Sequence, residues 1–278
     1  MKPLAPYNRL VSLLVALVAV ATVRCADPPP EAPKDLQELC GFLYEHSVDS
    51  DQAQLIEGLE NLYEWMDANG ASVREGHTVF NLNKTAIEST GNTTLPDSKL
   101  VGAVVAGDSG FDVKAMARAL GVDNTLEVNG DAYVAFERTW QGDPECFAQQ
   151  KFMSVSSDSL SEAKWAGLIS VKYNSHLEFR WVPTSRGWVM IHRSFLNEKP
   201  EVSLSIIDVR QNYWLGVVMP TSKKTGDSRA TLLQTNWSDV DYGILPVPES
   251  TALNMIVSSM KDSFDATETW MNGNYKKP

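Results

Sequence analysis

The chain has 278 residues, and its 24 basic and 35 acidic side chains give a formal net charge of −11. A surface of this sign repels phosphate backbones, so we expect no nucleic-acid partner and no adhesion to an anionic membrane by bulk charge. A chain of this length can bury a large hydrophobic core, and length alone leaves one or two domains open.

The N-terminus has the pattern of a cleavable secretory signal. Lys2 and Arg9 precede an apolar run, Leu10 to Val23, which is shorter than the roughly 20 residues that a membrane-spanning helix needs. We predict a signal peptide over residues 1–25 and a mature protein that is secreted, or periplasmic if the source is bacterial. An earlier cleavage site, acylation of Cys25 and an uncleaved anchor are the alternatives. Loss of the signal leaves 21 basic and 35 acidic residues, a net charge near −14.

The cysteine count favours one disulfide. Without Cys25, Cys40 and Cys146 are the remaining pair, and in an oxidising compartment we predict that they are bonded. Closing a loop of about 100 residues contributes up to about 4.7 kcal/mol to stability in the chain-entropy model. Two buried free thiols are the alternative, because cysteine is common in protein cores.

Three N-x-S/T sequons offer glycosylation acceptors if the source is eukaryotic: Asn83, Asn92 and Asn236.

Helical periodicity follows a Pro-rich linker at residues 26–34. Leu36, Leu39 and Leu43, and then Leu55, Leu59 and Leu62, recur at helical spacing on either side of a short break. We therefore predict an N-terminal helical hairpin over residues 35–70, with Gly70 as the stop of its second helix.

Residues 71–278 are rich in β-signals and end in a helix. Short β-like runs at Thr78 to Leu82 and Leu100 to Val105 precede a helix capped by Asp112. Hairpin-spaced strands are then predicted at Tyr133 to Trp140, Phe147 to Val155, Gly167 to Tyr173, Leu177 to Trp181, Trp188 to Phe195, Val202 to Val209, Trp214 to Met219 and Ala230 to Trp237. Only Ser159 to Trp165 offers a helical interruption, so consecutive strands should pair antiparallel.

A long amphipathic helix is predicted to close the chain. Leu253, Ile256, Met260, Phe264 and Met271 follow one another at three- and four-residue steps. The expected fold is therefore α+β, with an antiparallel sheet wrapped around a long C-terminal helix and a helical hairpin in front.

Several segments of the second half are similar to START lipid-transfer domains, which have the helix-grip fold. The similar segments are Leu177 to Pro183 with Trp188, Tyr213 to Leu215, Ala230 to Leu233, and Asp239 to Pro246 before the last helix. The resemblance covers roughly Ala71 to Asn274 and is clearest after Val171. The helical hairpin lies outside the family pattern, and the first half departs from it.

The resemblance implies one hydrophobic ligand, a lipid or sterol, in a cavity between the sheet and the C-terminal helix, and a transient membrane contact is left open. The resemblance places Met255, Ser259 and Phe264 of the helix, or their neighbours one turn away, at the ligand. Trp181, Trp188 and Trp214 fall in or beside predicted strands and are further candidates to line the cavity. Ordinary core packing is the alternative for each of them.

No catalytic, metal or cofactor motif stands out in the sequence. The four histidines have no ligand spacing, although His176 and His192 fall on neighbouring predicted strands, and neither G-x-S-x-G nor G-x-G-x-x-G is present. We expect a ligand-binding protein without turnover, with no cofactor and no metal. The alternatives are an extracellular protein-interaction module, and a cyclase or aromatase-type enzyme that uses the same cavity.

Overall fold

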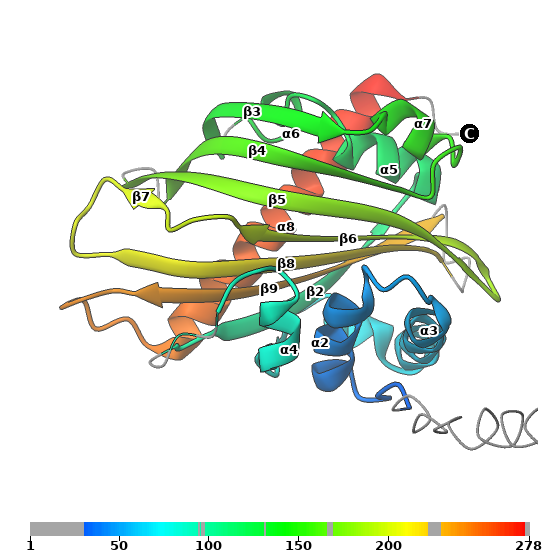
Figure 1. Cartoon of the computed structure of the whole chain (residues 1–278), viewed down its shortest axis with the longest axis horizontal. Helices are drawn as coiled ribbons and strands as arrows, with labels where there is room; N and C mark the ends of the chain where they lie inside the picture. Colours follow the sequence, from blue (N-terminus) through cyan, green and yellow to red (C-terminus); the bar gives the residue numbers. More distant parts are fainter. Residues whose placement is uncertain are drawn as a thin grey trace, which may run out of the picture. The chain divides into compact units, whose positions relative to one another are not determined.

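An antiparallel sheet forms the centre of the computed structural model (Figure 1). Its nine strands in the described part of the chain are β1 (His77–Val79), β2 (Val101–Ser109), β3 (Tyr133–Gln141), β4 (Ser154–Trp165), β5 (Ile169–Thr184), β6 (Gly187–Leu196), β7 (Glu201–Val202), β8 (Asp208–Pro220) and β9 (Ala230–Asp241). They lie in the order β1-β2-β9-β8-β6-β5-β4-β3, and β7 pairs with β5.

The structure describes residues 31–93, 95, 98–130, 132–165, 169–221 and 229–275. The predicted signal peptide and the first part of the predicted linker lie outside them. The described residues from Ala32 onward belong to one unit of the chain, Ala32–Pro278.

Seven helices accompany the sheet in these residues: α2 (Leu36–His46), α3 (Ala53–Val73), α4 (Lys84–Glu88), α5 (Val113–Leu120), α6 (Leu126–Asn129), α7 (Pro144–Ala148) and α8 (Glu249–Asn274). Local capping explains several of their starts. The carboxylate of Asp112 accepts a hydrogen bond from the backbone N–H of Ala115 and opens α5, as its position in the sequence predicts. None of these helices combines the length and apolar character needed to cross a membrane.

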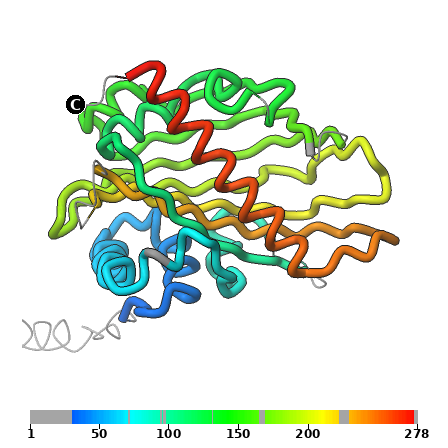
Figure 2. The backbone as a smooth tube through the Cα atoms, turned by 180° about the vertical axis from the view of Figure 1, so that it is seen from behind, coloured from blue at the N-terminus to red at the C-terminus, as the bar shows by residue number. Residues whose placement is uncertain are grey.

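Successive side chains of a strand point to opposite faces of the sheet, and here both faces are covered. We call the face under α8 the inner face, which carries Ser159, Ser175 and His192, and the opposite one the outer face. Helices α2, α3 and α4 lie on the outer face and α8 crosses the inner face, as the two opposite views show (Figure 1, Figure 2).

Aromatic packing fixes the helical hairpin to the outer face. Tyr44 of α2 meets the rings of Tyr213 and Trp237 edge-on, at centroid distances of 6.0 and 5.7 Å. The indole Nε1 of Trp237 donates to the backbone oxygen of Phe80 at 2.9 Å. All three rings are buried, so the predicted hairpin shares one hydrophobic core with strands β8 and β9.

An ion pair lies in the same interface. The guanidinium of Arg193, which is 2% exposed, donates to the Glu178 carboxylate at 2.6 Å and to the backbone oxygen of Tyr44 and the hydroxyl of Ser89. Burial of a charge is tolerated only with such partners.

Helix α8 approaches the inner face most closely at β2. Met260 packs with Ala103 and Val105, and the ring of Phe264 lies directly over Gly107. A Cβ added at Gly107 would come within 2.8 Å of two ring carbons of Phe264. The absence of a side chain at Gly107 therefore allows this contact.

The predicted fold class is confirmed: an antiparallel sheet, a long C-terminal helix and N-terminal helices in front. Helix α8 contains the predicted segment Leu253 to Met271 and extends it at both ends, whereas α3 continues past the predicted stop at Gly70 to Val73.

Several predictions for the strand region need correction. Val202 to Val209 is not one strand, because β7 ends at Val202 and β8 begins at Asp208. The predicted strand Leu177 to Trp181 and the described part of the predicted strand Gly167 to Tyr173 both belong to β5. Phe147 belongs to the short helix α7, which Pro144 and the capping carboxylate of Asp143 begin, so β4 starts only at Ser154. The helical alternative at Ser159 to Trp165 is wrong, because this segment is the second half of β4. Its inner positions are Ser159, Ser161 and Ala163, so it lacks the apolar alternation by which strands are usually recognised.

Candidate functional site: a cavity beneath the C-terminal helix

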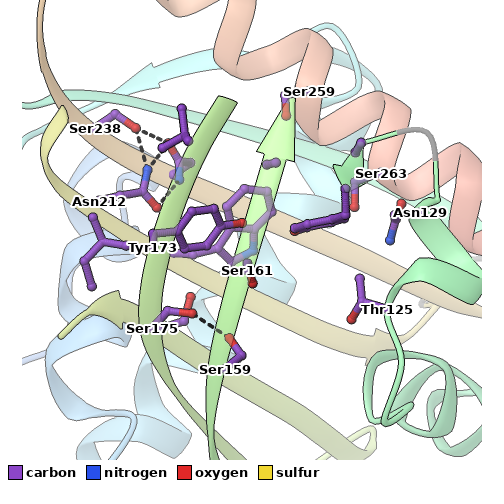
Figure 3. Close-up of a pocket in the computed structure, with 18 of the residues that line it drawn as sticks. Thr125, Asn129, Ser159, Ser161, Tyr173, Ser175, Asn212, Ser238, Ser259 and Ser263 are labelled. Carbon is purple, nitrogen blue, oxygen red and sulfur yellow. Dashed lines mark hydrogen bonds between the residues drawn. The ribbon is translucent and has the colours of Figure 1, made fainter. Parts of the chain in front are cut away.

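A cavity of about 470 Å³ lies between the inner face of the sheet and α8 (Figure 3). Strands β3, β4, β5, β6, β8 and β9 provide its floor, and Ala252, Met255, Ile256, Ser259 and Ser263 of α8 line it from the other side. Residues on α6 and on the segment after α5 complete the lining. The volume falls within the range of about 300–1,000 Å³ that is usual for small-molecule sites.

Short side chains on the floor explain why the cavity exists. Ser159 and Ser161 of β4 and Ser175 of β5 are buried and point into the space that large residues would fill in an ordinary core. The outer face carries Tyr213 and Trp237 on neighbouring strands instead. The protein therefore packs one face of the sheet and leaves room on the other.

Aromatic and aliphatic side chains line part of the cavity. Leu177 and Phe179 of β5 line this part, and Phe179 packs against Trp140 and Phe147 at centroid distances of 5.6 and 6.1 Å. This wall gives an apolar ligand a surface to bury.

A polar network occupies part of the floor from β8 and β9. The amide nitrogen of Asn212 donates to the hydroxyl of Ser238 at 2.6 Å, and that hydroxyl donates to the amide oxygen of Asn236 at 2.8 Å. Asn212 and Ser238 are labelled in Figure 3. The lining is therefore amphipathic, which suits a ligand with both an apolar body and polar groups.

His192 lies on the cavity wall and has no hydrogen-bond partner on either ring nitrogen among the described residues. Its ring stacks on Phe179 at 5.4 Å. Burial, with a smaller contribution from the positive charge of Arg138, lowers the pKa of His192 to about 4. The imidazole is therefore neutral at physiological pH and offers one donor and one acceptor to the cavity.

Tyr173 also lines the cavity, next to Ser161 in Figure 3. Burial raises the pKa of this phenol well above its ordinary value, with further contributions from Tyr133. Its hydroxyl is therefore a neutral donor and acceptor throughout the physiological pH range.

Three of the six predicted ligand-binding residues line the cavity. They are Trp214 on β8 and Met255 and Ser259 on α8. Met255 and Ser259 share one face of α8 because residues four apart on a helix point the same way.

The other three predicted residues are elsewhere. Trp181 is fully buried in a hydrophobic cluster, where its indole Nε1 donates to the backbone oxygen of Phe147 at 2.7 Å. Trp188 lies opposite Pro183 near the end of the β5–β6 hairpin and is 40% exposed. The ring of Phe264 packs over Gly107 of β2 and does not line the cavity.

The two histidines predicted to fall on neighbouring strands do not meet. His192 is opposite Phe179, and His176 is opposite Phe195. His176 also lies on the outer face, where it contacts the carboxylate of Asp158 at 2.8 Å.

The predicted disulfide is wrong for this structure, because Cys40 and Cys146 are free. Cys40 lies on α2 and is buried in the hydrophobic core, whereas Cys146 lies on α7 and is partly exposed. Burial raises the pKa of the Cys40 thiol to about 12. The alternative of two buried free thiols is met in part, because both thiols are unpaired but only Cys40 is buried.

The asparagines of the three sequons differ in how exposed they are. Asn83 is exposed and caps α4, and Asn92 is partly buried with its amide bonded to the backbone oxygen of Leu196 at 3.2 Å. Asn236 is 4% exposed and its amide is bonded inside the sheet. A glycan on Asn236 would not fit this fold, so that predicted acceptor is wrong.

The residues that sequence reasoning missed are mainly small and polar. Ser159, Ser161, Ser175 and Arg138 carry no motif, and the only available signal was their strict alternation with residues of the outer face. Among the described residues, no group of three or more His, Cys, Asp or Glu side chains is placed to hold a metal ion.

A sheet that grips a long C-terminal helix over a cavity defines a protein with the helix-grip fold, the fold of the START-like domains that the sequence resembles. Solved structures to which this chain is similar include a STAR-related lipid transfer protein from Xanthomonas axonopodis (10% identity, 65% of this chain and 90% of that chain, TM-score 0.42). A second is TTHA0849 from Thermus thermophilus (9% identity, 62% of this chain and 98% of that chain, TM-score 0.43). A third is Ara h 8.0201 (9% identity, 63% of this chain and 99% of that chain, TM-score 0.36). No family model and no curated protein matches the sequence.

Proposed function

We propose that this protein is exported and that it binds or carries a hydrophobic ligand, a lipid or sterol, in the cavity beneath α8. The observation that supports the proposal most strongly is the unfilled floor of the inner face, where buried serines take the place of core side chains. A natural sequence normally fills such a space because voids lose packing energy. A ligand that occupies the space offsets that loss.

Export is part of the proposal and is supported by the signal-like N-terminus of the sequence. Asn83 and Asn92 remain as glycosylation acceptors if the source is eukaryotic. Delivery of a poorly soluble ligand would require a transient contact with a membrane or with a protein partner.

The test is extraction of the secreted protein with organic solvent, followed by mass spectrometry. We expect one lipid or sterol per chain. Ser161→Trp would place an indole in the cavity and should remove most of the bound ligand, because the two compete for the same space. Ser156→Trp is the matched control, since Ser156 is on the same strand but points to the outer face, where its hydroxyl bonds Gln141 at 2.9 Å.

Wild-type protein that is consistently free of ligand would refute the carrier function. Equal ligand content in the two tryptophan variants would refute the location of the ligand.

A second candidate is an enzyme of the cyclase or aromatase type, favoured by His192 in the cavity, whose ring nitrogens have no hydrogen-bond partner in the part of the chain that the structure describes. A neutral imidazole there is positioned to exchange a proton with a bound substrate. This candidate predicts that the extracted ligand loses water on incubation with ligand-free protein, and that His192→Phe stops the change. A ligand mass that stays constant during incubation would eliminate this candidate.

A further inference from the structure

Three polar side chains form a row across the floor of the cavity. Arg138 of β3 is directly opposite Ser159 of β4, and Ser159 is directly opposite Ser175 of β5. All three point to the inner face, and the two hydroxyls are 2.9 Å apart, as the dashed line in Figure 3 marks. One hydroxyl of the pair uses its hydrogen on the other, so the second keeps a hydrogen to donate to a ligand.

The guanidinium of Arg138 is held in place by hydrogen bonds, but not all of its N–H donors have an acceptor in the described part of the chain. Its Nη1 donates to the backbone oxygens of Leu120 and Val122 at 3.2 and 2.8 Å, and its carbon lies 5.0 Å from the ring centroids of both Phe136 and Trp140. Its Nε is buried without an acceptor among the described residues. A buried donor in this state costs free energy unless a ligand supplies the acceptor.

The charges around the cavity have one sign. Among the described residues that line it, Lys99, Arg138 and Lys164 are basic and none is acidic, although acidic residues outnumber basic ones in the chain as a whole. Strand acids near the floor, such as Asp158 and Glu178, point to the outer face and pair with cations or histidine there.

Two groups near Arg138, the phenol of Tyr133 and the carboxylate of Asp123, bear on its charge, and each opposes the effect of burial on its pKa. The Asp123 carboxylate accepts a hydrogen bond from the indole of Trp140 at 2.8 Å, and the described residues show no ion pair between Asp123 and Arg138. Burial lowers the pKa of Arg138 to about 10, which leaves the guanidinium charged at neutral pH. Its positive charge contributes to the low pKa of His192 across the cavity.

We propose that the ligand is an anionic amphiphile, with an apolar body and one carboxylate, sulfate or phosphate group, and that Arg138, Ser159 and Ser175 bind the anionic group. We call these three residues the head-group site. The inference rests on the proposed function, since it specifies the ligand of the same cavity. A guanidinium flanked by hydroxyl donors is the arrangement that binds such oxyanions through charge-assisted hydrogen bonds.

The test compares two fluorescent probes that share one aromatic body. 1-Anilinonaphthalene-8-sulfonate carries a sulfonate, and N-phenyl-1-naphthylamine is its neutral counterpart. We expect the wild-type protein to bind the sulfonate at least about tenfold more tightly, because a hydrogen bond to a charged group is worth roughly 1.5–3 kcal/mol. Dodecanoate or dodecyl phosphate should displace the sulfonate probe, and dodecanol should displace it far less well.

Substitutions then locate the site. Arg138→Gln should weaken binding of the sulfonate about tenfold or more and leave binding of the neutral probe unchanged, whereas Arg138→Lys should retain part of the preference. Lys84→Gln is the control for the loss of one charge, because Lys84 is an exposed residue of α4 on the outer face. Binding of the neutral probe reports that the cavity of each variant is intact.

The outcomes separate the two proposals. If neither probe binds, the proposed function fails, and the head-group site fails with it. If the wild-type protein binds both probes equally well, or if Arg138→Gln does not reduce the preference, the cavity binds hydrophobic ligands but the head-group site is refuted. The wild-type comparison needs no variant, so it decides the question even if Arg138→Gln does not fold.

Discussion

The contact between α8 and the sheet can be tested by adding one methyl group. In Gly107→Ala, the new Cβ would lie 2.8–2.9 Å from three ring carbons of Phe264, whereas ordinary contacts are longer than 3.4 Å. The ring has Trp270 and Met271 in the same cluster and cannot retreat freely. We expect a loss of about 1–3 kcal/mol in the free energy of unfolding, the usual cost of overpacking.

The assay is urea denaturation followed by tryptophan fluorescence, with thermal unfolding as a second probe. A loss of this size corresponds to a decrease of roughly 2–12 °C in Tm for a domain of this length. Gly41→Ala is the matched control, because its Cβ would meet only a Leu82 methyl at 4.0 Å, and alanine should stabilise α2 by up to about 1 kcal/mol.

A double-mutant cycle provides the refutation. Replacing the ring by the smaller side chain in Phe264→Leu should restore most of the unfolding free energy that Gly107→Ala loses. The two substitutions should therefore couple by about 1 kcal/mol or more. Strict additivity, or a Gly107→Ala variant as stable as the wild type, would mean that α8 does not lie on β2 as described.

Three further predictions follow from other parts of the fold. Because the pKa of His192 is about 4 when folded and about 6.5 when unfolded, stability should fall by up to about 3 kcal/mol between pH 6.5 and pH 4, and urea midpoints of His192→Phe should lack this component. Glu178→Gln should cost about 2 kcal/mol, because Arg193 then keeps a buried charge with weaker partners, and a change below about 0.5 kcal/mol would contradict this. Since Cys40 and Cys146 are unpaired, dithiothreitol should not change the melting temperature of the wild-type protein, and a clear decrease would show that they are bonded.

The two faces of the sheet differ in how fully they are packed. The outer face is a packed core that contains Tyr44, Tyr213 and Trp237, and the buried Arg193 pairs beside it with the partly exposed Glu178. The inner face has a cavity whose floor carries buried serines and Arg138. A well-packed outer face stabilises the fold and allows the inner face to retain an unfilled cavity.

The secondary structure was largely predictable because its signals are local. The spacing of Leu253, Ile256 and Met260 predicts α8, and the capping position of Asp112 predicts α5. The failures have different local causes. The second half of β4 has serines where a strand usually has apolar residues, and Phe147 belongs to a helix that Pro144 begins.

The sequence by itself determined the fold class and which residues of α8 face the sheet, because both depend on periodicity along a continuous segment. Only the tertiary structure decided that Arg138, Ser159 and Ser175 form one row, and that Cys40 and Cys146 do not meet. The reason is that strand register joins residues far apart in the chain, and that register depends on pairing across the whole sheet rather than on any local pattern.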